Sequence, residues 1–202
     1  MAVTTWIVLG VLWSAFFLWY TNLRGPLRAE EIEAILARRS ARGDDPAAIA
    51  NFRAFLEGDT GRDFVMVNLI DFPAKPKPVA GLKPGETTQE VMGRYMAHMW
   101  PQLLKRACHP VLMGKAAADA VDIWGIDGAE HWSQCGLMRY RSRRDLVAIG
   151  GNPEFQGPHE FKIAAMTKTI AFPASPWIQL GDPRLVLGLL FFSIGMTVLA
   201  FS

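Results

Sequence analysis

The sequence predicts an α+β protein in which one βαββαβ domain is flanked by two apolar helices. Two observations predict this organisation. The 21 Lys and Arg and the 19 Asp and Glu residues all lie between Arg24 and Arg184, so neither end of the 202-residue chain carries a charged side chain. Inside the charged window, strand-like apolar runs alternate with segments of helical periodicity. The net charge of +2 gives no support for nucleic-acid binding, and no nucleic-acid partner is expected.

Residues 1–23 predict a membrane-spanning helix. The charge-free run from Val3 to Tyr20 reaches about 27 Å at 1.5 Å per residue, close to the hydrocarbon thickness of a bilayer. A cleaved signal peptide is the alternative, but it needs basic residues before the apolar run and a small-x-small site after it. The sequence has neither feature. We therefore expect an uncleaved anchor.

Residues 185–202 predict a second span, reached through a linker at 177–184. A buried core helix is the alternative, and such a helix needs a polar face. Ser193 and Thr197 are the only polar residues in this run before the terminal serine. We therefore expect the chain to cross the membrane twice, with membrane lipid as a partner.

The arginines near the two runs predict the orientation of the chain. Four follow the first run and one precedes the second: Arg24, Arg28, Arg38, Arg39 and Arg184. No Lys or Arg lies beyond either run on the other side. The positive-inside rule therefore places the central window in the cytoplasm and both termini outside.

Residues 24–58 predict a helical linker between the first span and the domain. Its first helix has acids in the early turns and arginines in the late turns, as the helix dipole favours, and ends at Gly43. Asp45 and Pro46 are typical of the N-cap and first position of a second helix, which ends at Gly58.

Residues 59–176 predict the domain itself. The apolar run at 64–71 is typical of a central strand, and the Pro- and Gly-rich segment 72–87 of an irregular loop. A helix then starts at Thr88, and Pro101 is expected to kink or split it. Its apolar stripe recurs every four residues, at Val91, Tyr95, Met99 and Leu103.

The rest of the domain predicts three strands and two short helices. The strands are expected at 109–115, 132–140 and 167–172. Ser142 is expected to cap one helix, and Pro153 to open the other. With right-handed crossovers the order βαββαβ is the ferredoxin-like arrangement, which leaves one sheet face uncovered. That face needs a partner, in most cases a second copy of the chain.

Several segments of the window carry a resemblance to a known family. They are MVNLI at 66–70, Tyr95, Gly114, RYRSR at 139–143 and NPEF at 152–155. With these segments, residues 64–172 resemble the small uncharacterised bacterial members of the dimeric α+β barrel superfamily. The chain departs from their Arg-Tyr-Pro-Ser-Arg and Asp-Pro-x-Tyr patterns at Arg141, Asn152 and Phe155. The resemblance implies a ferredoxin-like dimer in a bacterium. It leaves activity open, because the superfamily holds oxygenases, isomerases, haem proteins and members with no known activity.

Four polar residues of the domain are pocket candidates: Asn68, Tyr95, His98 and Arg139. Asn68 interrupts an apolar strand, where it could orient a substrate carbonyl. Tyr95 and His98 lie one helical turn apart, where they could exchange protons. The alternatives are a structural amide bonded to backbone and a half-exposed structural histidine.

Arg141, Arg143 and Arg144 belong to the densest charge cluster in the chain and are candidates for binding an anion or a lipid headgroup. The alternative is a solvated face paired with acids such as Asp145 and Glu154.

No metal and no cofactor is expected. Cys108 and Cys135 lack C-x-x-C spacing, the four histidines lack ligand spacing, and no phosphate-binding glycine motif occurs.

The leading functional hypothesis is a membrane-anchored, non-catalytic protein of the bacterial inner membrane. It would self-associate as a homodimer or serve as an accessory subunit of a larger membrane complex. The alternative is a membrane-tethered oxygenase or isomerase that acts on a hydrophobic substrate, so the sequence leaves enzymatic activity undecided.

Overall fold

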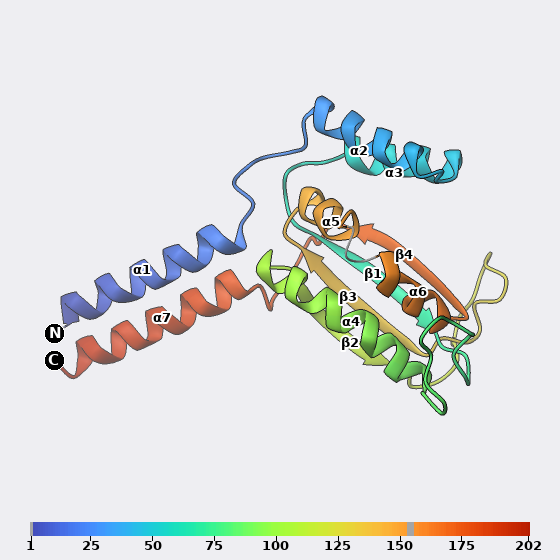
Figure 1. The fold of residues 1–202 in the computed structure, drawn as a ribbon. Helices are drawn as coiled ribbons and strands as arrows, with labels where there is room; N and C mark the ends of the chain where they lie inside the picture. The colour runs from blue at the N-terminus through green and yellow to red at the C-terminus, as the bar shows by residue number, and fades with distance from the viewer. Residues whose placement is uncertain (1, 153–155) are drawn as a thin grey trace.

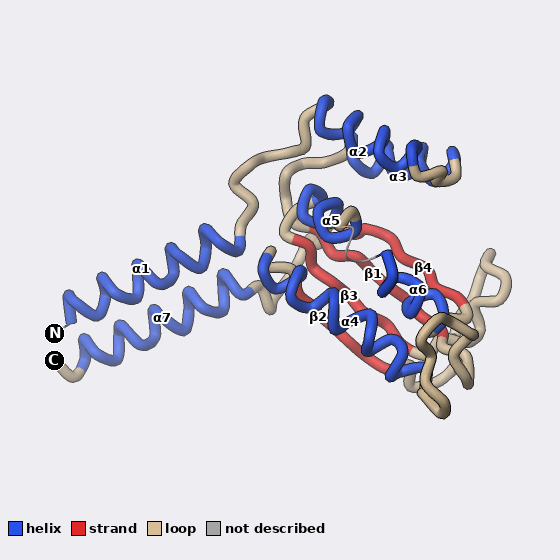
Figure 2. The backbone as a smooth tube through the Cα atoms, viewed as in Figure 1, coloured by secondary structure: helices blue, strands red, loops and turns tan. Residues whose placement is uncertain are grey.

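A computed structural model describes residues 2–152 and 156–202 (Figure 1). Its helices are α1 (Ala2–Tyr20), α2 (Ala29–Ala41), α3 (Pro46–Glu57), α4 (Thr88–Lys105), α5 (Arg143–Gly150), α6 (Gln156–Ala164) and α7 (Pro183–Ala200). Its strands are β1 (Phe64–Asp71), β2 (His109–Lys115), β3 (Gln134–Tyr140) and β4 (Lys168–Ala174). The predicted order of helices and strands is thus confirmed. Figure 2 shows the strands gathered in one sheet with the helices outside it.

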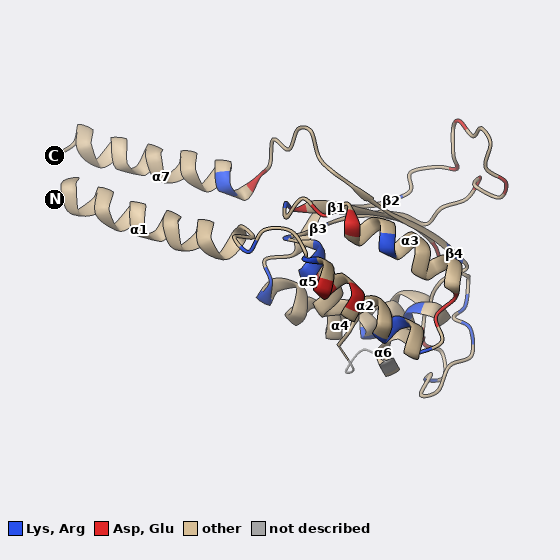
Figure 3. Ribbon diagram, turned by 90° about the horizontal axis from the view of Figure 1, so that it is seen from above, with Lys and Arg blue, Asp and Glu red and all other residues tan. Residues whose placement is uncertain are grey.

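The four strands form one antiparallel sheet in the order β2-β3-β1-β4. This is the ferredoxin-like arrangement. Helices α4, α5 and α6 lie on one face of the sheet, and among the described residues no helix lies on its other face (Figures 1 and 3). We call this second face the open face. Residues directly opposite each other in the ladder share a face, so the register assigns every strand side chain to one side.

The core lies between the sheet and α4. Phe64 of β1 faces Tyr140 of β3, and their rings stack with centroids 5.5 Å apart. Met99 and Leu103 of α4 close over them, as the four-residue stripe in the sequence predicts. Helix α4 continues through Pro101, so the helix is not split there.

The bounds of two strands differ from the sequence prediction. Strand β3 begins at Gln134 and not at Trp132. Strand β4 runs on through Pro173 to Ala174. A proline is tolerated there because β4 is an edge strand, whose outward N–H has no partner strand. The helix start predicted at Pro153 lies outside the described residues.

The segment 24–58 is a packed hairpin of α2 and α3. The Asp45 side chain accepts a hydrogen bond from Ala48 N, the predicted N-cap. The hairpin has its own apolar core, and Phe55 joins this core to that of the sheet. The buried members of the hairpin core are Leu27, Ile32, Ile35, Leu36 and Leu56.

Helices α1 and α7 pack side by side and leave the same end of the sheet (Figure 1). Both are long and apolar enough to cross a membrane, and few of their side chains are buried. Small residues of α7 receive the indole rings of α1. A Cβ on Gly195 would lie 2.5 Å from the Trp6 ring, and one on Gly188 would lie 3.1 Å from the Trp13 nitrogen.

Gly61 brings the start of β1 against the segment that follows α1. Its φ is +73°, and a Cβ there would lie 2.6 Å from the carbonyl carbon of Gly25. Asn22 donates to the Gly61 carbonyl at 2.8 Å and to that of Gly25 at 3.1 Å, which holds the two segments together.

We predict that Gly61→Ala lowers the free energy of unfolding by more than about 2 kcal/mol. Gly85→Ala is the matched control, because Gly85 also has a positive φ (+75°) but has open space around its Cβ position. Gly85→Ala should lower the free energy of unfolding by only about 1 kcal/mol, the cost of placing a residue with a Cβ in the left-handed backbone conformation. Guanidinium unfolding of the detergent-purified protein, followed by circular dichroism, measures both. Equal losses would show that the close approach to Gly25 does not matter.

Candidate functional site: a buried arginine cluster at the helix–sheet junction

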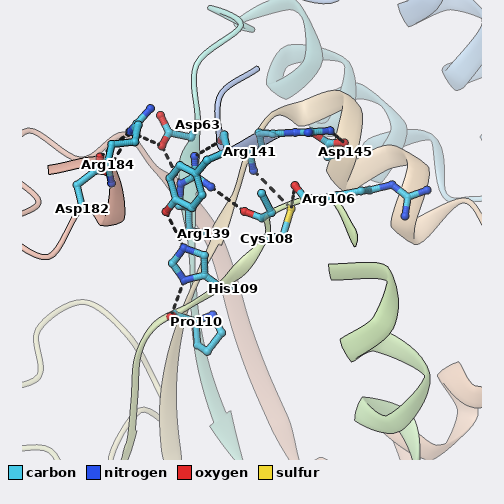
Figure 4. A network of polar contacts seen from close by, with 12 residues as sticks. Asp63, Arg106, Cys108, His109, Pro110, Arg139, Arg141, Asp145, Asp182 and Arg184 are labelled. Atoms are coloured by element: carbon cyan, nitrogen blue, oxygen red, sulfur yellow. Dashed lines mark hydrogen bonds and ion pairs between the residues drawn. The ribbon is translucent and has the colours of Figure 1, made fainter. Parts of the chain in front are cut away.

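Arg139 of β3 is the centre of the cluster (Figure 4). It lies opposite Val65, so its side chain is on the open face, at the end where α1 and α7 meet the sheet. Although it is a charged residue, it is only 1% exposed. Its Nε donates to Asp63 at 2.8 Å, and its two terminal nitrogens donate to the Ala107 carbonyl at 2.7 Å and the Tyr20 carbonyl at 3.1 Å. A buried cation of this kind is stable only when paired and hydrogen-bonded in this way.

Tyr20, the last residue of α1, packs its ring on Arg139. The guanidinium carbon lies 3.7 Å from the ring centroid, a close cation–π contact. The Tyr20 hydroxyl lies 2.6 Å from His109 Nε2, and His109 Nδ1 lies 2.9 Å from the Pro110 carbonyl. Since a carbonyl only accepts, we assign the histidine proton to Nδ1, so the tyrosine hydroxyl donates to Nε2.

Arg141, directly after the end of β3, binds the same helix end. It donates to both Asp145 oxygens at 2.9 Å and to the Trp19 carbonyl at 2.9 Å. The hydrogen bonds to Asp145 raise the pKa of Arg141. Arg139 and Arg141 thus satisfy carbonyls in the last turn of α1, where the helix dipole is negative.

Arg184, in the first turn of α7, joins the cluster through Asp63. It donates to Asp63 at 3.1 Å and forms a tight pair with Asp182. Burial alone would raise the pKa of Asp182, but the hydrogen bonds from Arg184 lower it. Asp63 therefore connects β3 to α7, while Arg139 connects β3 to α1. We call the set Tyr20, Asp63, His109, Arg139, Arg141 and Arg184 the junction cluster.

Two neighbouring hollows open beside the junction cluster. The first has a volume of about 320 Å³ and is lined by Thr21, Asn22, Gly61, Arg62, Asp63, Arg139, Arg141 and Arg184. The second has a volume of about 660 Å³, shares Arg62, Asp63 and Arg184 with the first, and adds residues of the segment between β4 and α7. Of the residues that the structure describes, two have buried polar atoms without a hydrogen-bond partner: Thr21 Oγ1 and Gln179 Nε2. Thr21 lines the first hollow and Gln179 the second.

The four pocket candidates are not brought together. Asn68 lies on the helix-covered face, where its amide donates to the carbonyls of Met66 and Gly136 at 3.0 and 3.1 Å. His98 is exposed on α4. Arg139 lies on the opposite face of the sheet from Asn68. The described residues therefore show no common pocket for these four side chains, and their catalytic role stays a prediction.

Tyr95 instead faces two residues of α6. Its ring centroid lies 6.5 Å from that of His159 and 5.8 Å from Lys162 Nζ. Burial raises the pKa of Tyr95 and lowers that of Lys162, while burial and the nearby lysine lower the pKa of His159. At neutral pH the Tyr95 phenol and the His159 imidazole are therefore both uncharged. Their contact is packing between uncharged rings.

The three anion candidates each contact an acid. Arg141 binds Asp145 as described, and Arg143 lies 3.7 Å from Asp59. Arg144 forms two hydrogen bonds with Glu31, at 3.0 and 2.9 Å, which hold the pKa of Glu31 at about 2. Their role in binding an anion stays a prediction.

Sequence reasoning missed Arg62, Asp63 and Tyr20 as members of this site. No motif connects them, because Tyr20 ends α1 while Arg62 and Asp63 lie in the turn before β1, and only folding brings them to Arg139 of β3. The one available signal was the dense arginine run at 139–144, in a chain whose first apolar helix has no basic residue of its own.

The two cysteines are free, as expected. Burial raises the pKa of the Cys108 thiol to about 11, so it is protonated and unreactive at neutral pH. Within the described residues, no three His, Cys, Asp or Glu side chains gather where they could hold a metal ion.

Solved structures share the fold. A protein of unknown function from Rhodopseudomonas palustris is 20% identical, with a TM-score of 0.52 over 67% of this chain and 95% of its own. The methylated form of the same protein is 20% identical, with a TM-score of 0.54 over 68% and 95%. A dimeric ferredoxin-like protein of unknown function from Bacteroides fragilis is 9% identical, with a TM-score of 0.34 over 56% and 96%.

No protein-family model matches the chain, and no curated protein sequence is significantly similar to it. The chain is therefore structurally similar to uncharacterised ferredoxin-like proteins, and at these identities the likeness shows the fold alone.

We predict that Arg139→Met lowers the free energy of unfolding by about 3–5 kcal/mol, because Asp63 and the Tyr20 and Ala107 carbonyls lose their shared donor. The double variant Arg139→Met/Asp63→Leu should recover part of this loss, since it also removes the carboxylate that has lost Arg139 as a partner and keeps only Arg184. Arg53→Met is the control, because the ion pair of Arg53 with Glu33 is exposed, and it should leave the unfolding midpoint nearly unchanged. If the Arg53 and Arg139 variants behave alike, the junction cluster does not hold the fold together.

Proposed function

We propose that the protein is a non-catalytic, membrane-anchored protein of the bacterial inner membrane whose cytoplasmic domain pairs with a second copy of the chain. The observation that carries the proposal is an uncovered apolar sheet face attached at one end to two apolar helices.

The two apolar helices support the membrane location. Helices α1 and α7 expose leucine, valine and phenylalanine side chains along most of their length, an apolar surface far larger than water-exposed surfaces carry. Trp19 is exposed at the domain end of α1, where an interfacial aromatic belt would lie. We infer two spans, with the domain in the cytoplasm and both termini outside.

The composition of the open face supports pairing. A bulge at Val111 leaves Leu112 opposite Leu137, so both belong to the open face. The other large apolar residues assigned to this face by the register are Val67, Leu69, Ile170 and Phe172. Leu112, Ile170 and Phe172 are exposed in the single chain. A face of this kind is stable in water only when another surface covers it.

The direction of α1 and α7 favours a second copy as the cover. Both helices leave the same end of the sheet and run roughly within its plane (Figures 1 and 3). A two-fold axis parallel to the helices can therefore bring two open faces together and keep all four helices in one membrane. Such a pair is isologous, with the same surface used on both copies.

An acidic segment projects on the same side of the sheet as the open face. The segment between β2 and β3, residues 116–133, projects from the far end of the sheet on the side of the open face (Figure 3). We call it the β2–β3 arm. It carries four acids and no Lys or Arg, and its Trp124 is 93% exposed.

A first prediction concerns topology. In intact cells an impermeant maleimide should label Ser202→Cys and should not label Ala80→Cys, because the C-terminus is proposed to lie outside and the exposed loop 72–87 inside. After the membrane is permeabilised, both should be labelled. Labelling of Ala80→Cys in intact cells would overturn the orientation.

A second prediction concerns pairing. Leu112→Asp should convert the detergent-solubilised dimer to a monomer in light scattering coupled to size exclusion, because it places a charge in the covered face. Leu104→Asp is the matched control, since Leu104 is 54% exposed on α4, against 50% for Leu112. A wild-type monomer would refute pairing. A stoichiometric different polypeptide that is lost in Leu112→Asp would show instead that the chain is an accessory subunit.

A further inference from the structure

The two hollows beside the junction cluster lie at the depth of lipid headgroups in the proposed membrane orientation. Thr21 and Asn22 directly follow the end of α1, and Arg184 lies in the first turn of α7. The hollows are therefore placed where both apolar helices enter the domain. This placement rests on the proposed membrane anchoring.

The charge around the first hollow is positive. Four guanidinium groups line it, from Arg62, Arg139, Arg141 and Arg184, against the single carboxylate of Asp63. Three of these arginines also bind acids, which are Asp63, Asp145 and Asp182. Arg62 is exposed, and its side chain forms no ion pair with any residue that the structure describes. One positive charge is left without a partner at the mouth of both hollows.

Hydrogen-bond donors at the hollows are also left without acceptors. Thr21 Oγ1 and Gln179 Nε2 are buried without a hydrogen-bond partner, which costs folding free energy. A phosphate oxygen that accepted hydrogen bonds from them would remove this cost. Together with Arg62, they offer a hydroxyl, an amide and a guanidinium, all groups that bind phosphate oxygens.

Part of the rim of the second hollow is an exposed apolar segment. Trp177 lines it and is 100% exposed, and Ile178 and Leu180 beside it are exposed too. A soluble anion would gain nothing from this rim. A lipid would, because its headgroup can bind the arginines while the rim contacts the glycerol and acyl region, where tryptophan is favoured.

We propose that the two hollows form a binding site for an anionic phospholipid headgroup, with Arg62, Thr21 and Gln179 as phosphate-binding residues and Trp177 at the acyl boundary. Asp63 and Asp182 do not prevent this, because Arg139 and Arg184 hold both carboxylates. The bound lipid completes the polar contacts at the point where the helices meet the sheet.

The test is a titration of the purified protein in neutral detergent with phosphatidylglycerol, phosphatidylcholine or inorganic phosphate, followed by native mass spectrometry and by tryptophan fluorescence. Phosphatidylglycerol should bind in preference to phosphatidylcholine. Arg62→Gln should raise its dissociation constant about tenfold, the effect of losing one charged hydrogen bond. Thr21→Val should weaken binding in the same direction while leaving the lipid-free protein folded.

Arg38→Gln is the matched control, because Arg38 is an exposed arginine of α2 that does not line either hollow. Equal affinity in wild type and Arg62→Gln, or an equal loss in Arg38→Gln, would overturn the site. Binding of inorganic phosphate as tight as that of the lipid would overturn the lipid assignment. Failure of membrane anchoring would be seen separately, as release of the protein from membranes by alkaline carbonate.

Discussion

The buried guanidinium of Arg139 is the constraint on which the arrangement depends. A charged group that is almost completely removed from water must have its donors satisfied, and here its partners come from three different parts of the chain: Asp63 before β1, the Ala107 carbonyl before β2 and the Tyr20 carbonyl at the end of α1. If any one of these partners moved away, a buried N–H donor of Arg139 would lose its acceptor. The apolar helices are therefore fixed to the sheet by the same interactions that order the sheet end.

The junction cluster also stabilises the C-terminal end of α1 electrostatically. Arg139 and Arg141 place two positive charges at the C-terminal end of α1, where unsatisfied carbonyls and the helix dipole are negative. The last turn of α1 carries no basic residue of its own, so Arg139 and Arg141 supply the groups that a helix C-terminus needs. A tertiary contact here replaces a local capping signal.

The helices and strands could be predicted from the sequence, but the junction cluster could not. Asp45 and Ser142 are capping residues whose effect is local, and both cap as predicted. The stripe on α4 has a regular period, so the covered face of that helix could be predicted too. The junction cluster depends instead on which face of β3 each arginine takes and on where α1 ends in space. Both follow from the register with β1, which no local pattern contains. For the same reason Asn68 and Arg139, which the sequence analysis assigned to one pocket, lie on opposite faces of the sheet.

The attachment of α1 to the sheet also has a geometric consequence. The Tyr20 ring and its carbonyl both contact Arg139, so the end of α1 is joined directly to strand β3. In the proposed orientation the sheet stands on the bilayer with its strands pointing away from it. Seven residues of β3 at about 3.3 Å each carry its far end roughly 23 Å into the cytoplasm. The height of the β2–β3 arm above the membrane is then set by the length of a strand, and any molecule that meets the arm must reach that height.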